Sequence, residues 1–391
     1  MRILIAHSFY RIAGGEDRYV REQVDVLRGN HEVELLARFN RDLEPSPLPA
    51  LRMTFSPSEY ANCGRTIRRF KPDVIHIHNA YPSLGPAVHL AARRQGIPIV
   101  MTVHNFRLRC PNGLMFTQGS PCQRCVGGAY WNAVTHECFP TRSQATAYAL
   151  SLSAHRFWFR LEKVVDCFVA PTEFMAERLR SWGIPSSRIT IIRYFTSSHP
   201  SATPPGQNGL FVGRLSAEKG VDVLLEALAQ AGDPPFEIAG SGPAGNDLRR
   251  KVADLGLANV KFLGQLDQEG VADALRRARY VAVPSLWDEP FGIVALEAQA
   301  AGRPVIGTAT GGLEELVRKG GGIVIAPRDT DALAAAIGRY VADDELIATA
   351  AERGRAFAIS EFTPTVHLAA LEHMYAKVVG RRPARVAPNR Q

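Results

Sequence analysis

Short apolar runs alternate with helical stretches along almost the whole chain, and this alternation limits the fold more than any other feature of the sequence. In the first half the runs are RILIAHS (2–8), EVELLA (32–37), DVIHIH (73–78), IPIVMTV (97–103) and VDCFVA (165–170). They are apolar at most positions, as strands covered on both faces of a parallel sheet are. Because helical segments separate them, we expect an α/β fold built from parallel strands.

A single segment rich in Pro, Gly and Ser interrupts the alternation. TSSHPSATPPGQNG (196–209) has no apolar periodicity and is typical of a linker. After it the alternation restarts, with helices expected to begin at Val221, Ala244, Val271, Ile293 and Asp331. The pattern predicts two Rossmann-like, doubly wound parallel-sheet domains facing a cleft, over residues 1–196 and 209–362, joined by a linker over 197–208.

The end of the chain has two parts. The helical run over 363–380 is expected to pack back on the first domain. The tail over 381–391 is polar and basic, and we expect it to be disordered.

Positive charge is concentrated in the first half of the chain. Residues 1–200 hold 25 Lys and Arg against 15 Asp and Glu, a balance of +10, while residues 201–391 hold 21 against 23, a balance of −2. A basic half fits an anionic partner such as the inner leaflet of a membrane, and it fits a solvated surface with no partner equally well. Nucleic acid is not expected as a partner, because the Arg residues are scattered without interleaved aromatic residues.

The cellular setting follows from two missing patterns. The sequence has no run of 18 apolar residues, so no transmembrane helix is expected. MRILIAHSFYR is too short and too polar after Ala6 to be a signal peptide. We therefore expect a cytoplasmic protein, with peripheral attachment at the inner membrane as an extension of that expectation.

Two cations follow the first apolar run of the second half. In GRLSAEKG (213–220), Arg214 and Lys219 emerge from GLFV into a tight loop. A pyrophosphate needs cations that stay charged and approach closely, and Arg can bind it through two parallel hydrogen bonds. Two solvated loop cations would have the same sequence, so this motif alone leaves both interpretations open.

The stretch WDEPFGIVALEAQAAG places two acids around a Pro-Gly break. Glu289 precedes the break, and Glu297 lies eight positions later in a predicted helix. A helix N-terminus binds anions, and the backbone N–H groups that open this helix are those of Phe291, Gly292 and Ile293. Eight helical residues span roughly 12 Å, more than the roughly 5–9.5 Å between the paired carboxyls of glycosidases. The spacing favours a ligand in which two hydroxyl-rich groups flank a diphosphate. The alternative for Glu297 is a solvated acid on the helix surface.

The order of these motifs carries a family resemblance. GRLSAEKG, AGSGP, VKFLGQL, PSLWDEPFGIVALEAQAAGRPVI and GGLEELV follow one another over about residues 209–340, and the first half contains GGE, PDVIHIH and TVHN. This set resembles the retaining family 4 glycosyltransferases of the bacterial surface-polysaccharide type, which have the GT-B fold. Two positions depart from the family pattern: Asn105 stands where Asp is frequent, and IIRYFTS (191–197) replaces an Asn-Gly-Val-Asp-like stretch.

The resemblance implies roles for the second half of the chain. Arg214 and Lys219 would hold the diphosphate of a nucleotide sugar, together with the amides that open the helix. Glu289 would contact hydroxyls of the transferred sugar, and Glu297 would bind the ribose. Since a nucleoside diphosphate leaving group needs charge stabilisation, no cofactor is expected for catalysis.

Further roles are implied for the nucleobase and for the first half. Gln265 and Leu266 would lie beside the base. Gly14 and Gly15 would let the first loop approach the diphosphate. His104 would face the acceptor and the transferred sugar as a catalytic residue.

Four of the six cysteines lie in one Gly-rich, aperiodic segment: Cys110, Cys122, Cys125 and Cys138. A loop of this length needs a staple or is disordered. In a reducing cytosol, four thiolates around a C-x-x-C core favour structural zinc over disulfides, with His136 as a substitute ligand. Reduced thiols without a metal are the second interpretation.

The sequence thus predicts a retaining hexosyltransferase with a nucleotide diphosphate sugar as donor and a lipid-linked or oligosaccharide acceptor. The alternatives are a nucleotide-sugar epimerase or phosphorylase on the same fold, and a non-catalytic nucleotide-sugar-binding scaffold of a polysaccharide assembly. The stretch 143–163 is a candidate for membrane contact, although a helix in the domain core explains it as well.

Overall fold

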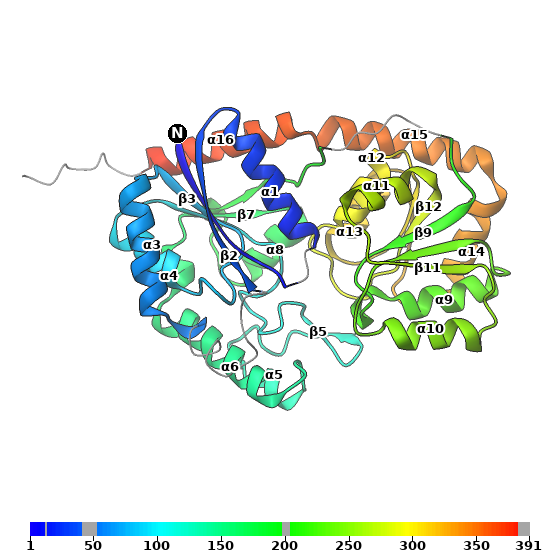
Figure 1. The fold of residues 1–391 in the computed structure, drawn as a ribbon, viewed down its shortest axis with the longest axis horizontal. Helices are drawn as coiled ribbons and strands as arrows, with labels where there is room; N and C mark the ends of the chain where they lie inside the picture. Colours follow the sequence, from blue (N-terminus) through cyan, green and yellow to red (C-terminus); the bar gives the residue numbers. More distant parts are fainter. Residues whose placement is uncertain (12–13, 41–52, 198–203, 382–391) are drawn as a thin grey trace, which may run out of the picture. The chain divides into compact units, whose positions relative to one another are not determined.

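The computed structural model divides the chain into two units (Figure 1). It describes residues 1–11, 14–40, 53–197 and 204–381. Unit 1 contains residues 1–113, 123–193 and 365 onward; unit 2 contains residues 114–122 and 194–364. Within the described residues each unit is built around a parallel six-stranded sheet, which confirms the predicted α/β class. Residues 198–203, half of the expected linker, and all but the first residue of the expected disordered tail lie outside the described residues.

The sheet of unit 1 has the order β2-β1-β3-β4-β7-β8. Its strands are β1 (Arg2–Phe9), β2 (Glu32–Phe39), β3 (Val74–Ile77), β4 (Ile99–Thr102), β7 (Cys167–Ala170) and β8 (Ile189–Ile191). Ile3, Leu4 and Ile5 are fully buried because β1 lies inside the sheet, between β2 and β3. The five apolar runs of the first half coincide with β1 to β4 and β7, whereas β8 was not among the predicted strands.

The helices of unit 1 include its C-terminal element. They are α1 (Gly15–Arg28), α3 (Pro57–Phe70), α4 (Ala87–Arg94), α5 (Asn132–Thr135), α6 (Arg142–Ser153), the π-helical turn η2 (Ala154–Trp158), α7 (Leu161–Val164), α8 (Glu173–Ser181), the 3-10 turn η3 (Ser186–Arg188) and, from Thr365 on, α16 (Pro364–Gly380). The hydroxyl of Tyr375 in α16 is hydrogen-bonded to Nδ1 of His76 in β3 (2.6 Å). The last helix is therefore fixed to the sheet of unit 1.

The sheet of unit 2 has the order β11-β10-β9-β12-β13-β14. Its strands are β9 (Asn208–Val212), β10 (Phe236–Ala239), β11 (Val260–Gly264), β12 (Ala278–Val283), β13 (Val305–Thr308) and β14 (Ile323–Ile325). The helices are η4 (Ala217–Lys219), α9 (Val221–Gln230), α10 (Gly245–Asp254), α11 (Gln268–Arg277), α12 (Ile293–Ala300), α13 (Gly311–Lys319), α14 (Thr330–Ala342) and α15 (Asp344–Glu361). Helix α11 begins three residues before the expected Val271, because the side chain of Asp267 accepts the N–H of Gly270 and caps the helix there.

A short hairpin from the first half of the sequence belongs to unit 2. It consists of β5 (Phe116–Thr117) and β6 (Ser120–Pro121), inside the segment Leu114–Cys122. The guanidinium of Arg328 donates a hydrogen bond to the carbonyl of Gly119 in this hairpin. The predicted boundary, which gave all of residues 1–196 to the first domain, therefore differs from the structure at this segment.

Each sheet has one point at which the strand order reverses direction. In unit 1 the chain goes from β1 to β2 on one side and continues with β3 on the other, and in unit 2 β10 and β12 flank β9 in the same way. Ligands of doubly wound sheets bind outside the carboxyl ends of the strands at such a point. Among the described residues, no helix is both long and apolar enough to cross a membrane.

Candidate functional site

In unit 2 the sequence motifs gather at the carboxyl ends of the parallel strands. The loop with Arg214 and Lys219 follows β9, the AGSGP turn follows β10, Gln265 follows β11, and the loop with Glu289 follows β12. Because β9 and β12 are neighbours at the reversal point, their two loops flank the place where a ligand of this fold binds.

Lys219 and Glu289 form an ion pair across this point. The Lys219 ammonium lies 2.5 Å from Oε1 of Glu289, and the hydroxyl of Ser285 donates to the same oxygen at 2.7 Å. The carboxylate of Glu289 is nearly buried, whereas Lys219 is partly exposed and also lies over the ring of Trp287. The sequence predicted both charged residues as ligand contacts; the structure shows in addition that they are paired.

The pairing decides the charge of Glu289. Burial alone would raise its pKa, but the charge of Lys219 and the hydrogen bonds from Lys219 and Ser285 outweigh burial and lower the pKa below its ordinary value of 4.5. Glu289 is therefore an ionised carboxylate at neutral pH. It can accept hydrogen bonds from hydroxyl groups, but it is not suited to donate a proton.

The loop that carries Glu289 is held by the segment after β13. The N–H of Gly312 donates to the carbonyl of Glu289 (2.7 Å), and the hydroxyl of Thr308 donates to the carbonyl of Ser285 (2.7 Å). Gly311 has φ +56°, and a Cβ there would overlap the carbonyl of Glu289. Sequence reasoning missed these supports; the only signal was the Gly-Gly pair in GGLEELV.

Gly292 starts helix α12 beside the ion pair. It has φ +96° and precedes Ile293, the first residue of α12, and a Cβ at Gly292 would lie 2.9 Å from the side chain of Leu313. The first N–H groups of a helix have no intrahelical acceptor, so they are available to an anion. Glu297 lies in the second turn of α12 and is half-buried. The break predicted at Pro290 and Gly292 is thus where the helix begins.

The two glycine-rich turns after β9 and β10 pack directly on each other. Gly240 has φ +144°, and a Cβ there would overlap the carbonyl of Gly213. The N–H of Leu215 donates to the carbonyl of Ser241 (3.0 Å), and the hydroxyl of Ser241 donates to Oε1 of Gln265 (2.8 Å). Arg214, between these contacts, is exposed, as a residue that binds a ligand phosphate can be.

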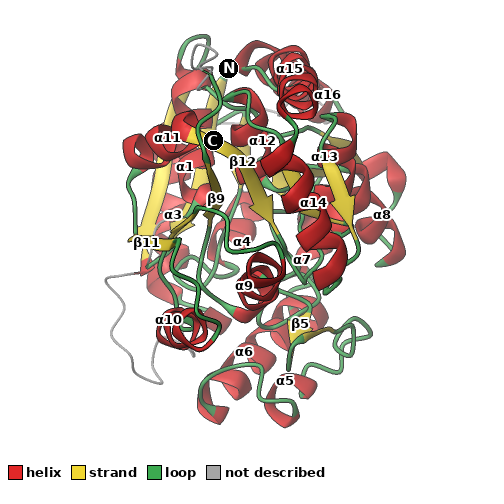
Figure 2. Ribbon diagram, turned by 90° about the vertical axis from the view of Figure 1, so that its right-hand side faces the viewer, coloured by secondary structure: helices red, strands yellow, loops and turns green. Residues whose placement is uncertain are grey.

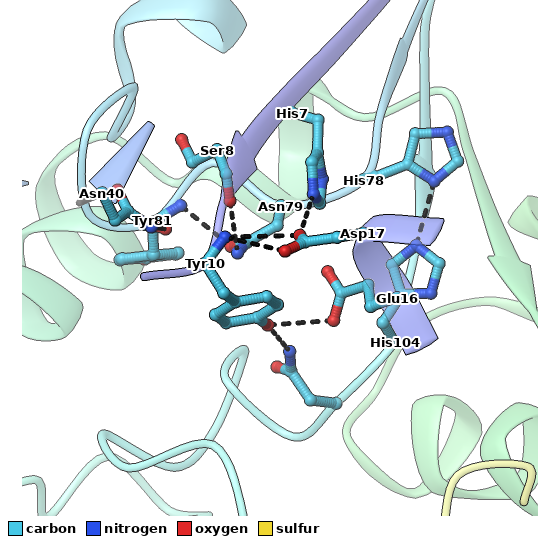
Figure 3. A network of polar contacts seen from close by, with 11 residues as sticks. His7, Ser8, Tyr10, Glu16, Asp17, Asn40, His78, Asn79, Tyr81 and His104 are labelled. Atoms are coloured by element: carbon cyan, nitrogen blue, oxygen red, sulfur yellow. Dashed lines mark hydrogen bonds and ion pairs between the residues drawn. The ribbon is translucent and has the colours of Figure 1, made fainter. Parts of the chain in front are cut away.

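In unit 1 a polar cluster occupies the carboxyl ends of β1, β3 and β4 (Figure 3). The carboxylate of Asp17 is hydrogen-bonded to Nε2 of His7 (2.8 Å) and accepts a hydrogen bond from the N–H of Tyr10 (3.1 Å). The hydroxyl of Tyr10 donates to Glu16 (2.9 Å), and the amide of Asn105 donates to the same hydroxyl (3.3 Å). Asn105, which departs from the family pattern, is therefore part of this cluster.

Several polar atoms of this cluster have no hydrogen-bond partner among the described residues. They are buried, and a bound ligand could satisfy them: Nδ1 of His7, Oγ of Ser8 and Oε1 of Glu16. Burial raises the pKa of Glu16, which lies directly after the predicted Gly14–Gly15 pair. At Gly14 φ is −131° and a Cβ would meet nothing within 4 Å, so neither strain nor packing requires glycine there. Close approach of a ligand remains a reason for it.

His104 lies in the same cluster and is buried. Its Nε2 is 2.9 Å from Nδ1 of His78, and Gln23 contacts the other ring nitrogen of His78 (3.3 Å). Burial, followed by the charges of His7 and His76, places the pKa of His104 well below its usual value of 6.5. His104 is therefore a neutral imidazole whose orientation depends on His78, and the sequence did not indicate that dependence.

The structural zinc predicted at the four clustered cysteines stays a prediction. Among the described residues, no group of three or more His, Cys, Asp or Glu side chains is placed to hold a metal ion. The thiol of Cys110 donates to the side chain of Asn112 (2.9 Å), and Cys125 packs in a buried cluster with Tyr130, Ala149 and Leu152. Cys122 belongs to unit 2. Metal analysis of the purified protein would test the predicted zinc.

Comparison with known proteins matches both halves of the chain. Residues 13–195 fit the family model "Glycosyltransferase Family 4", and residues 207–357 fit "Glycosyl transferases group 1". A D-inositol 3-phosphate glycosyltransferase of Streptomyces griseus is 30% identical over 327 residues, which are 76% of this chain and 67% of that protein. The chain belongs to this family of glycosyltransferases. A relative of the same name from Corynebacterium jeikeium is 42% identical, but over 35% of either protein.

Solved structures of glycosyltransferases share the fold of this family member. Sucrose-phosphate synthase from Thermosynechococcus elongatus superposes with a TM-score of 0.72 at 21% identity, covering 97% of this chain and all of that one. HepE from Anabaena, in complex with UDP-glucose, superposes with a TM-score of 0.67 at 21% identity, covering 96% of this chain and all of HepE. The glycosyltransferase therefore has the predicted GT-B architecture.

Proposed function

We propose that this glycosyltransferase moves a hexose from a nucleotide diphosphate sugar to a lipid-linked or oligosaccharide acceptor, with retention of anomeric configuration. Bacterial surface-polysaccharide assembly, on the cytoplasmic side of the inner membrane, is the proposed setting. The observation that carries the proposal is the Lys219–Glu289 pair, which lies beside the N-terminus of α12 at the reversal point of the unit 2 sheet.

The two residues of the pair can bind different parts of the donor: Lys219 the diphosphate and Glu289 the transferred sugar. The diphosphate develops charge as it leaves, and Lys219, Arg214 and the first amides of α12 supply positive charge and N–H donors for it. Glu289, kept ionised, would accept hydroxyl groups of the transferred sugar. With these cations in place we expect catalysis without a metal cofactor. The UDP-glucose bound to HepE supports a nucleotide sugar as the donor class.

The remaining residues complete the proposed site. Glu297 would bind the ribose, and Gln265 and Leu266 would lie beside the base. In unit 1, Gly14 and Gly15 would leave room for the diphosphate. His104, a neutral imidazole at physiological pH, would serve as a hydrogen-bonding group toward the acceptor and the transferred sugar. Retention rests on the family resemblance.

The test is a nucleotide-release assay with a panel of nucleotide sugars, run with and without a lipid extract that contains polyprenyl-linked sugars. We expect nucleoside diphosphate release and a glycosylated lipid product with one donor, only when the extract is present, and unchanged by EDTA. Conversion of a donor to another sugar nucleotide without any acceptor would instead indicate an epimerase. Donor binding by thermal shift without turnover on lipid or oligosaccharide acceptors would indicate a scaffold, and either result would overturn the proposal.

A further inference from the structure

Four large apolar side chains of unit 1 are exposed around helices α5 and α6. Their exposed fractions are 57% for Trp131, 50% for Leu150, 52% for Phe157 and 81% for Trp158. We call these four residues the aromatic surface. Trp158 is the most exposed large apolar side chain of the described residues. Burying such side chains is the main energetic reason for having them, so their exposure calls for a partner.

The segments that carry the aromatic surface pack against one another. The guanidinium of Arg156 donates to the carbonyl of Val126 (2.8 Å), which holds the loop before Trp131 against η2. A Cβ at Gly128 in that loop would lie 2.8 Å from the ring of Phe157. Figures 1 and 2 both show α5, which begins directly after Trp131, beside α6.

The segment below the aromatic surface is well packed, so the exposure is not a sign of a loose chain. Ala149 and Leu152 of α6 are buried in the same cluster as Tyr130, while Leu150 between them points outward. The π-helical turn η2 then buries Ala154 and leaves the two aromatic residues that end it exposed. Leu150 is thus an exposed large apolar side chain on a helix whose other exposed residues, Arg142, Ser143 and Gln144, are polar.

Positive charge exceeds negative charge in the sequence segment that carries the aromatic surface. From Arg124 to Lys163 the chain holds five Lys and Arg and two Glu. One of the two acids, Glu162, is occupied by an ion pair with the buried guanidinium of Arg109. The exposed cations of the segment are Arg124, Arg142, Arg160 and Lys163. Exposed Trp together with Arg and Lys is the composition of a surface that lies in an anionic membrane interface.

We propose that the aromatic surface docks unit 1 on an anionic lipid bilayer. Trp131 and Trp158 would lie at the level of the headgroups, where their rings meet apolar chains and their N–H groups meet water. The exposed cations of the same segment would face lipid phosphates. A protein partner is the other occupant that this composition allows, because Trp, Phe and Arg are also enriched in protein interfaces, and the experiment below separates the two. Docking on the bilayer depends on neither the donor nor the acceptor of the reaction.

The experiment is flotation of the full chain with vesicles of phosphatidylcholine alone and of phosphatidylcholine mixed with phosphatidylglycerol, at low and high salt. We expect binding only to the mixed vesicles, weakened by salt, with a blue shift of Trp fluorescence. The double variant Trp131→Ser, Trp158→Ser should bind about tenfold more weakly. Arg160→Gln and Lys163→Gln should each weaken binding by about fivefold at low salt.

Ile359→Ser in unit 2 is the matched control, since Ile359 is 43% exposed and lies away from the aromatic surface in sequence and unit. It should bind vesicles as the wild type does. Thermal unfolding of all variants should be unchanged, because the replaced side chains are exposed. Three outcomes each overturn the proposal: equal binding to both kinds of vesicle, wild-type binding by the Trp double variant, or no vesicle binding together with a dimer in sedimentation velocity that the Trp substitutions dissolve.

Discussion

At the scale of single residues, the donor site depends on how one carboxylate is kept charged. Glu289 is nearly buried, and burial by itself would raise its pKa; the ammonium of Lys219 and the hydroxyl of Ser285 lower the pKa below its ordinary value. Removing one partner of such a pair leaves an unpaired charge in a poorly hydrated place. Substitution of either Lys219 or Glu289 is therefore expected to disturb the other residue as well. Glu297 is not a member of this pair, so its substitution is the better test of donor binding apart from turnover.

We expect alanine substitution of the two acids to have different kinetic effects. Glu297→Ala should mainly weaken donor binding, by about tenfold to a hundredfold, because a ribose hydroxyl loses a charged acceptor. Glu289→Ala should mainly lower kcat, by about a hundredfold to a thousandfold, because its contacts serve the reacting sugar. Steady-state kinetics over a range of donor concentrations separates the two effects.

Glu314→Ala is the control for these two variants. Glu314 pairs with Arg318 on the exposed face of α13, so its loss should leave both kinetic constants near wild type. If Glu289→Ala and Glu297→Ala both lost only donor affinity, the assignment of Glu289 to the transferred sugar would be wrong.

The charged residues of the site could be predicted from the sequence, whereas the residues that hold them in place could not. Lys219 and Glu289 stand in motifs with a recognisable order, and each follows a strand directly, so their meeting at one sheet edge was predictable. Thr308 and Gly311 act through backbone contacts with a loop some twenty residues earlier, and such contacts leave no periodic pattern. The dependence of His104 on His78 is of the same kind, because only the pairing of β3 and β4 brings the two rings together.

At the scale of elements, the loop between β12 and α12 is positioned by the turn between β13 and α13. Gly311 is the closest point, since a Cβ there would meet the backbone of Glu289 at a φ that side chains rarely adopt. Gly311→Ala should lower the free energy of unfolding by about 1–3 kcal/mol and displace the Glu289 loop. Donor affinity, measured by calorimetric titration, should fall with it.

Gly338→Ala offers a matched comparison within unit 2. Gly338 lies inside α14, and a Cβ there would meet nothing within 4 Å. This substitution should raise the free energy of unfolding by up to about 1 kcal/mol, because Ala is the better helix former, and it should leave donor affinity unchanged. Equal effects of the two substitutions would contradict the supporting role of the β13–α13 turn.

Elements were predictable where the pattern is local. The apolar runs identified the strands that are buried on both faces, and the helix starts at Val221 and Ile293 coincide with α9 and α12. The start of α11 was missed by three residues because the side chain of Asp267, not the apolar pattern, decides it. The hairpin at Leu114–Cys122 was assigned to the wrong domain, since its contact with Arg328 joins residues about two hundred positions apart.

At the scale of the whole molecule, histidine is divided very unevenly between the two units. The described residues of unit 2 contain none, and the one histidine in its sequence range, His199, lies outside the described residues. In unit 1, burial lowers the pKa of His76 and His89 to about 3 and of His155 and His367 to about 4, and burial places His78 and His104 well below 6.5. Because these imidazoles are neutral in the folded state, protonation of described histidines opposes folding in unit 1 and not in unit 2.

The sign of the resulting pH dependence follows from which state binds protons first. Because the folded pKa values lie below the unfolded value of 6.5, the unfolded state is protonated first as the pH falls. The contribution of these histidines to the free energy of unfolding is fully present above pH 6.5. It is lost as the pH falls toward 4, at about 1.4 kcal/mol per pH unit for each such histidine. Glu16 opposes this trend, since burial raises its pKa and the folded state therefore binds its proton first, but one carboxyl cannot offset six imidazoles.

We therefore expect acid to unfold unit 1 before unit 2. Hydrogen exchange read by mass spectrometry along a urea series, at about pH 7 and about pH 5, should show the protection of β1, β3 and β4 falling steeply with pH. The protection of β9, β12 and β13 should change little in the same interval, because no described histidine lies in their unit. His367→Gln keeps a donor for the carbonyl of Arg193. The stability of unit 1 should then fall less steeply with pH, by the contribution of one histidine. Loss of protection in unit 2 first, or in both units together, would show that the buried imidazoles do not control acid stability.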